Sequence, residues 1–201
     1  IRDLSEIKEL HDVELVAKIL QAQAGQLLNY SDVAKKVQVS VDSVKRWLQT
    51  LKSLYYCFTL QPWTKNVTRS LLKEPKIYLY DWALLEDKGA RVENFVASHL
   101  LKAVQFWQDR GLGEYGLYFL RDKEKREVDF LVTKNEEPWF LVEAKSSMKE
   151  SLSKSLFYFQ EQLEVPHAFQ LAFDMPFEQV NAFQAKKPVI VSARSFLSQL
   201  V

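Results

Sequence analysis

The feature that most restricts the fold of this chain is a pair of stretches that alternate apolar and charged residues. They are Glu127-Val-Asp-Phe130 and Phe140-Leu-Val-Glu-Ala-Lys145. A period of two residues is typical of β-strands with one buried face. The polar tract between them, residues 133–138 (Thr-Lys-Asn-Glu-Glu-Pro), suits a tight connection. The sequence therefore predicts a β-hairpin whose turn centres near Glu136.

This register has a chemical consequence. Asp129 and Glu143 each lie seven residues from Glu136, so antiparallel pairing places them opposite each other. Lys145 follows Glu143 by two positions and projects from the same face of its strand. Charged groups among Val, Phe, Leu and Trp side chains are costly to bury unless something compensates them. A divalent cation is the simplest compensator for two carboxylates.

The hairpin lies in a longer pattern of strands and helices in the second half of the chain. The predicted order is helix 91–108, strands 117–121, 127–133 and 138–145, helix 152–163, strands 167–173 and 188–191, and helix 194–200. This order predicts an α/β (α+β) fold in which helices flank a mixed sheet.

The first half predicts a different unit. Apolar stripes and capping residues indicate helices at 12–24, 33–37 and 41–54, and β-like runs follow at 55–62 and 76–80 around the basic tract 65–73. Three helices and a hairpin are the plan of a winged helix-turn-helix, with the third as recognition helix. With the junction placed within residues 84–90, we predict a winged-helix domain at 1–86 and a second domain at 87–201.

The distribution of charge suggests a partner for the first unit. Net charge is only +1, yet residues 31–73 hold eight Lys or Arg against two Asp. Lys45, Arg46 and Lys52 lie on the predicted recognition helix and are the candidate DNA contacts. The alternatives are that they are ordinary solvated helix residues, or that this winged helix binds protein.

A fourth member of the charged cluster is predicted on the helix at 91–108. Glu93 shares a stripe with Ala97, Leu100 and Val104, so a carboxylate occupies an otherwise apolar face and could join Asp129 and Glu143. Carboxylate oxygens suit Mg²⁺ or Mn²⁺, and Lys145 could stabilise charge at a phosphate. The alternatives are that Glu93 serves the helix dipole, that Asp129 faces solvent, and that Glu143 and Lys145 form a surface ion pair on an edge strand.

Other features bound the environment. The single cysteine, Cys57, excludes an internal disulfide, no apolar run is long enough for a bilayer span, and no signal peptide is visible. We expect a cytoplasmic protein without a membrane partner. The start at Ile1 suggests a piece of a longer protein.

Taken together, Asp129, Glu143-Ala-Lys145 and Glu93 on a preceding helix resemble the restriction-endonuclease-like superfamily, whose signature is Asp…(Asp/Glu)-x-Lys on a hairpin. More narrowly, the chain resembles the C-terminal half of a family of uncharacterised prokaryotic AAA-type ATPases, which carry a P-loop module, a winged helix and a nuclease-like domain. Four stretches carry this resemblance: residues 29–48, 75–81, 92–97 and 127–132.

The resemblance implies roles for these residues. Asp129 and Glu143 would be metal ligands, Glu93 an auxiliary ligand and Lys145 the catalytic lysine of a Mg²⁺-dependent deoxyribonuclease. No Gly-x-x-x-x-Gly-Lys-Ser/Thr occurs, so the resemblance also implies that the ATP site lies in an N-terminal ATPase module outside this chain. The competing expectation is a catalytically silent module that binds nucleic acid or protein and regulates that ATPase.

Overall fold

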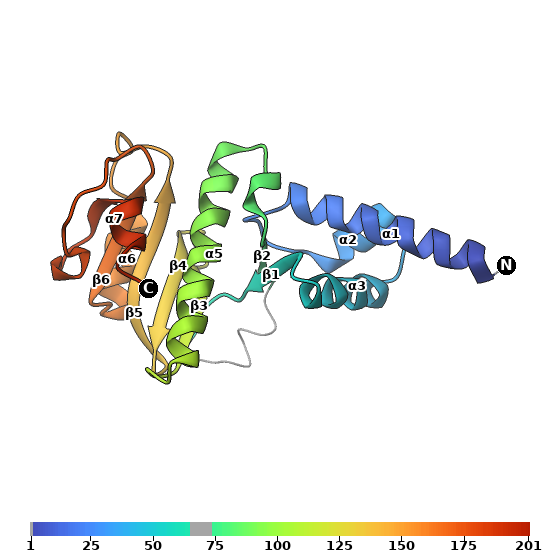
Figure 1. Ribbon diagram of the computed structural model, residues 1–201, viewed down its shortest axis with the longest axis horizontal. Helices are drawn as coiled ribbons and strands as arrows, with labels where there is room; N and C mark the ends of the chain where they lie inside the picture. Colours follow the sequence, from blue (N-terminus) through green and yellow to red (C-terminus); the bar gives the residue numbers. More distant parts are fainter. Residues whose placement is uncertain (1, 65–73) are drawn as a thin grey trace.

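The computed structural model describes residues 2–64 and 74–201, which form two units joined through one long helix (Figure 1). The N-terminal unit holds helices α1 (Arg2–Ala22), α2 (Tyr30–Val37) and α3 (Val41–Ser53) and the antiparallel strands β1 (Cys57–Leu60) and β2 (Lys76–Leu79). Three helices followed by a hairpin confirm the predicted winged-helix plan. The basic tract 65–73 lies outside the described residues.

Local chemistry accounts for the N-terminal helices. The Asn29 side chain accepts a hydrogen bond from the Asp32 amide and caps α2, while Ser40 caps α3 through the Ser43 amide. The apolar stripes of the three helices then meet in one core with Cys57, Ile77 and Leu79 of the hairpin. Helix α1 begins ten residues before the predicted start because its first turns carry mainly charged and polar residues, which give no apolar periodicity.

The C-terminal unit is built on a five-stranded mixed sheet in the order β3-β4-β5-β6-β7. Strands β3 (Tyr115–Arg121), β4 (Glu127–Lys134) and β5 (Glu137–Lys145) are antiparallel, and β6 (His167–Ala172) and β7 (Val189–Ser192) continue parallel to β5. With helices α5 (Lys88–Asp109), α6 (Lys154–Leu163) and α7 (Ala193–Leu197), the predicted α+β class and element order are confirmed. Short 3₁₀ turns, η1 (Trp82–Leu84) and η2 (Ala182–Gln184), complete the elements.

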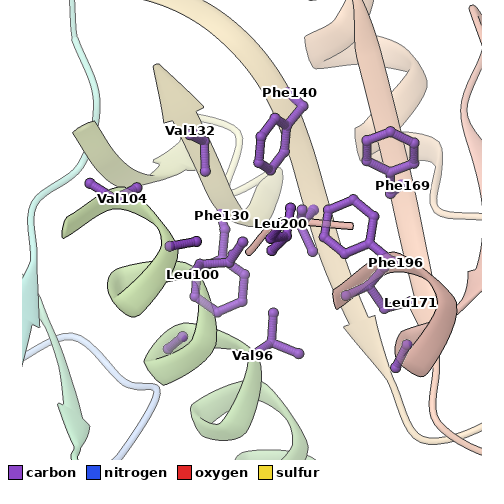
Figure 2. Packing of buried hydrophobic residues seen from close by; sticks show 14 of the residues in the cluster. Val96, Leu100, Val104, Phe130, Val132, Phe140, Phe169, Leu171, Phe196 and Leu200 are labelled. Atoms are coloured by element: carbon purple, nitrogen blue, oxygen red, sulfur yellow. The ribbon is translucent and has the colours of Figure 1, made fainter. Parts of the chain in front are cut away.

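Helices cover both faces of this sheet. On one face, α5 and the C-terminal segment pack onto Phe130, Phe140 and Phe169, as Figure 2 shows. On the other face, Leu156 and Phe159 of α6 pack onto Leu131 and Leu141. The period-two pattern of β4 and β5 thus divides their side chains between two cores, which fixes the register of the central hairpin.

The two units share part of their cores, and α5 lies between them (Figure 1). Phe58 and Tyr78 of the β1–β2 hairpin belong to the same buried cluster as the α5 stripe. The fully buried side chain of Asn94 accepts a hydrogen bond from the Leu79 amide at 2.8 Å and donates one to the Leu79 carbonyl at 2.6 Å. Helix α5 therefore satisfies the outer edge of β2 in the way that a neighbouring strand would. Within residues 2–64 and 74–201, no helix is long and apolar enough to cross a bilayer.

Candidate functional site

The candidate site lies where the two central strands part. Pairing between β4 and β5 ends at Phe130 with Val142. Beyond this pair β4 continues along β3 as far as Glu127, and β5 continues along β6 as far as Lys145. The two strands diverge there, and their facing backbone N–H and C=O groups no longer pair with each other. A polar side chain can therefore enter between them.

Asp129 fills this gap. Its Oδ2 accepts a hydrogen bond from the Ala144 amide at 2.8 Å, which brings its carboxylate next to Glu143. Asp129 therefore lies beside Glu143, as predicted. The two strands are connected here by the Asp129 side chain and not by backbone hydrogen bonds. Strand β4 has one extra residue between Val128 and Leu131, which shifts its register with β3. This β-bulge lies at the same point as the gap between β4 and β5.

Glu143 is buried beside Asp129. Its side chain is 10% exposed, Oε1 lies 3.1 Å from the Lys145 ammonium, and Oε2 is buried without a hydrogen-bond partner. Strand β5 is the central strand of the sheet, so the alternative of a surface ion pair on an edge strand is wrong. A buried, unpartnered carboxylate oxygen is costly and calls for a cation or proton.

The electrostatics of the pair agree with this placement. Burial, together with the carboxylates of Glu93 and Glu143, raises the pKa of Asp129 well above its ordinary value. Burial also raises the pKa of Glu143, against the opposing effects of Lys145 and of the Asp129 backbone amide. Burial alone would lower the pKa of Lys145, but Glu143 and Asp129 outweigh it and raise that pKa, so Lys145 stays charged at neutral pH.

Glu93 reaches the cluster from α5 but binds other groups. Its Oε1 accepts hydrogen bonds from Tyr78 Oη at 2.7 Å and Lys76 Nζ at 3.1 Å. Gly25, at a φ of +78°, leaves room for this carboxylate, since a Cβ there would lie 3.3 Å from Glu93 Oε2. The structure thus places Glu93 near Asp129 and pairs it with the N-terminal unit; its role as a metal ligand stays a prediction.

Lys76 and Glu127 are members of the cluster that the sequence did not reveal. The Lys76 side chain is 4% exposed and its Nζ lies 2.6 Å from Glu127 Oε1, while Arg121 pairs with Oε2 of the same glutamate. Burial would lower the pKa of Lys76, yet Glu93, Asp129 and Glu127 raise it well above its ordinary value. A lysine at the first position of a short strand gives no sequence signal of burial.

Gln170 was also missed. It is fully buried on β6 opposite Glu143, accepts a hydrogen bond from the Ser153 amide and donates to the carbonyl oxygens of Glu150 and Ser151. It thereby fixes the segment before α6 beside the end of β5. A lone polar residue in the apolar run 168–172 was the signal that could have identified it.

The donor set fits a hard divalent cation through two carboxylates. Over the described ranges 2–64 and 74–201, no three His, Cys, Asp or Glu side chains gather in an arrangement that could hold a metal ion. Asp129 and Glu143, which lie together at the strand gap, are the candidate ligands. Mg²⁺ keeps several waters and needs only one or two carboxylates beside a phosphate, so this pair is sufficient.

The predicted DNA contacts of α3 differ in their surroundings. Lys45 is exposed, whereas Arg46 pairs with Glu9 of α1 at 2.7 Å, and Lys52 Nζ donates to Thr59 Oγ1 at 3.1 Å. Trp47 Nε1 donates to the same Glu9 oxygen, at 3.0 Å. Of these three residues, Lys45 is therefore the most accessible to a DNA phosphate. Arg46 would have to exchange its ion pair with Glu9 for such a contact.

Comparisons with known proteins divide the chain at the start of α5. Residues 1–89 match a family model described as a domain of unknown function (DUF8612), and residues 88–184 match one described as a domain of unknown function (DUF4143). The chain is 26% identical over 147 residues to Uncharacterized protein Rv2008c of Mycobacterium tuberculosis and to Uncharacterized protein Mb2031c of Mycobacterium bovis. The match covers 66% of this chain and 31% of each relative, so the chain spans less than a third of their length. No solved structure matches.

Proposed function

We propose that the C-terminal unit is a Mg²⁺-dependent nuclease domain that hydrolyses phosphodiester bonds in DNA. The observation that carries this proposal is the buried Oε2 of Glu143, which has no partner while Asp129 lies beside it and Lys145 lies 3.1 Å from Oε1. An acidic pair with a free oxygen and a neighbouring ammonium matches the needs of phosphoryl chemistry: a metal ligand set and a positive group for the developing charge.

Each residue has a distinct role in this proposal. Asp129 and Glu143 would hold the ion, which would polarise the phosphate as a Lewis acid and lower the pKa of a bound water. Lys145, kept protonated by Glu143, stabilises negative charge on the phosphate oxygens and orients the water. The Ala144 amide holds Asp129 at the strand gap, and Gln170 holds the adjoining segment 150–153.

The N-terminal unit would engage the DNA duplex through α3, with Lys45 as the freest basic residue of that helix. We further propose that the chain is the C-terminal part of a prokaryotic ATP-binding protein. The DUF4143 family is often found in proteins associated with AAA-type ATPases, and the mycobacterial relatives extend well beyond the matched region. ATP would act only through that further module.

A second candidate function is a catalytically silent module that binds nucleic acid or protein and regulates the ATPase. One observation favours it: Lys76 already compensates Glu93 and Glu127, so part of the acidic cluster is neutral without any metal ion. Both candidate functions use the same fold, and only the first includes catalytic cleavage of DNA.

The test is a cleavage assay with plasmid, single-stranded and branched DNA, each with Mg²⁺ or Mn²⁺. The nuclease proposal predicts metal-dependent cleavage that falls at least 100-fold in Lys145→Ala and in Asp129→Ala, since each removes transition-state stabilisation. Lys134→Ala, at the opposite end of β4, is the matched control and keeps full activity. Absence of cleavage on all three substrates, or cleavage indifferent to Lys145→Ala, favours the silent module.

A further inference from the structure

The N-terminal unit places a buried ammonium inside the acidic cluster of the C-terminal unit. Lys76 belongs to β2, whereas Glu93 and Glu127 belong to α5 and β4. Its Nζ lies 3.1 Å from Glu93 Oε1, 2.6 Å from Glu127 Oε1 and 5.6 Å from the centroid of the Phe119 ring. Two carboxylates from different elements thus converge on one internal cation.

Lys76 engages the carboxylates that a second metal ion would need. Two-metal phosphoryl-transfer sites hold their ions about 3.5–4 Å apart, bridged and flanked by carboxylates. Around Asp129, the further carboxylates available for such an ion are Glu93 and Glu127. Both are already bound to protein donors: Lys76 and Tyr78 for the first, Lys76 and Arg121 for the second.

Charge balance supports the same conclusion. Glu93 and Glu127 carry two negative charges, and Lys76 with Arg121 supplies two positive charges at contact distance. Asp129 and Glu143 have only Lys145 in ion-pair contact, while Lys76 acts on Asp129 without contacting it, and Oε2 of Glu143 has no hydrogen-bond partner. The net negative charge that contact ion pairs leave uncompensated therefore lies at the Asp129–Glu143 end, which is where a divalent cation would bind.

We propose that Lys76 is a built-in replacement for a second metal ion: it withdraws Glu93 and Glu127 from metal binding and limits the site to one divalent cation. Lys76 is then a positioning residue supplied by the winged-helix unit, so both units build the site. This inference deepens the proposed function, and it rests on that function for the identity of the first ion. It also means that Glu93 is no metal ligand while Lys76 is in place.

Removal of the lysine tests the idea, because it leaves two partly buried carboxylates without their shared cation. Such a pair is strongly destabilising unless a new cation enters. We expect Lys76→Met to bind two Mn²⁺ per chain where the unaltered chain binds one, measured by electron paramagnetic resonance of free Mn²⁺ in a titration. The additional ion is lost again in the double variant Lys76→Met/Glu93→Gln. Lys18→Met, which removes an exposed lysine of α1 in the same unit and outside the cluster, keeps one ion.

The titration separates failure of this inference from failure of the proposed function. One ion in both the unaltered chain and Lys76→Met overturns the role of Lys76 and leaves the function standing. No ion in the unaltered chain and one in Lys76→Met supports the role of Lys76 and contradicts the metal-dependent function. No ion in either contradicts both. If Lys76→Met does not fold, Lys76→Asn, which keeps a neutral donor for the carboxylates, is titrated and judged in the same way.

Discussion

Asp129 accepts a hydrogen bond from the Ala144 amide across the gap at which β4 and β5 separate. A side chain here replaces a backbone ladder bond, and the replacement brings two carboxylates together at the end of an apolar sheet. The charge that this arrangement concentrates is unfavourable unless a cation compensates it. Enzyme sites commonly accept such a cost in stability in exchange for function.

The first prediction concerns pH and stability without divalent metal. Because the pKa of Asp129 is raised in the folded chain, the group stabilises the fold below its unfolded pKa of about 4 and loses that contribution as pH rises through the folded pKa. The variant Asp129→Asn has no carboxylate to ionise, so its free energy of unfolding does not fall over this pH range. We expect the variant to match the unaltered chain near pH 4 and to exceed it at pH 7–8 by on the order of 1 kcal/mol, or about 2–4 °C in Tm.

Urea unfolding at several pH values in the presence of a chelator measures this difference. Asp109→Asn, which removes a carboxylate at the exposed C-terminal end of α5, serves as the matched control. A stability difference that is the same at pH 4 and pH 8 would show that Asp129 is not held in an unfavourable ionised state.

The second prediction concerns DNA binding by α3. Lys45→Glu should weaken duplex binding and flatten its dependence on salt by about one to two units of the log–log slope, because one phosphate contact is lost and a repulsive charge is added. Glu9→Gln should act in the opposite direction, since it frees the Arg46 guanidinium from its ion pair. Fluorescence anisotropy across a salt series gives both slopes. Unchanged slopes in both variants would assign α3 to another partner.

The third prediction concerns the junction between the two units. Asn94→Ala leaves the buried amide of Leu79 without a partner and its carbonyl with only a long hydrogen bond from Ser98 Oγ, at 3.4 Å, and an unpaired buried group costs about 1–3 kcal/mol. We expect a loss of about 2–4 kcal/mol in the free energy of unfolding, measured in urea. Asn181→Ala, which removes an exposed cap of η2, should cost about 1 kcal/mol or less. Equal losses in the two variants would mean that Asn94 does not fasten β2 to α5.

The fourth prediction concerns the close approach of Gly25 to Glu93. In Gly25→Ala, the alanine is strained by the positive φ and its Cβ also crowds Glu93 Oε2. In Gly111→Ala, the alanine has a similar φ of +69°, but there is open space around its Cβ. The difference between the two losses in unfolding free energy isolates the crowding. We expect Gly25→Ala to lose about 1 kcal/mol more than Gly111→Ala. A difference of zero would indicate that Glu93 moves freely and is not fixed by its partners.

Much of the fold could be predicted from the sequence, because its signals are local. Period-two alternation located β4 and β5, and the distance of Asp129 and Glu143 from the turn brought them together. The observed turn, with Asn135 and Glu136 at positive φ, lies where the pattern centred it. A one-residue shift in the pairing of β4 with β5 follows between Val132 and Thr133. From Val132 to Phe130 the strands then pair in the register predicted for a turn centred at Glu136.

The rest depended on contacts between distant elements. Lys76 has no local sign of burial, and its partners Glu93 and Glu127 lie 17 and 51 positions away. Glu93 was expected to join Asp129 and Glu143, and its pairing with Lys76 and Tyr78 follows from the docking of β2 against α5, which no periodicity encodes. The ion pair of Arg46 with Glu9 was hidden for a related reason, since the first turns of α1 have no apolar stripe.

The central claim is that Asp129 and Glu143 together hold one divalent ion, and calorimetric titration of Mn²⁺ into the chain tests it most directly. The account predicts one binding event that disappears in Asp129→Ala and in Glu143→Ala but persists in Glu137→Gln, an exposed carboxylate at the start of the same strand. Binding that survives in Glu143→Ala, or the absence of any binding to the unaltered chain, would contradict it.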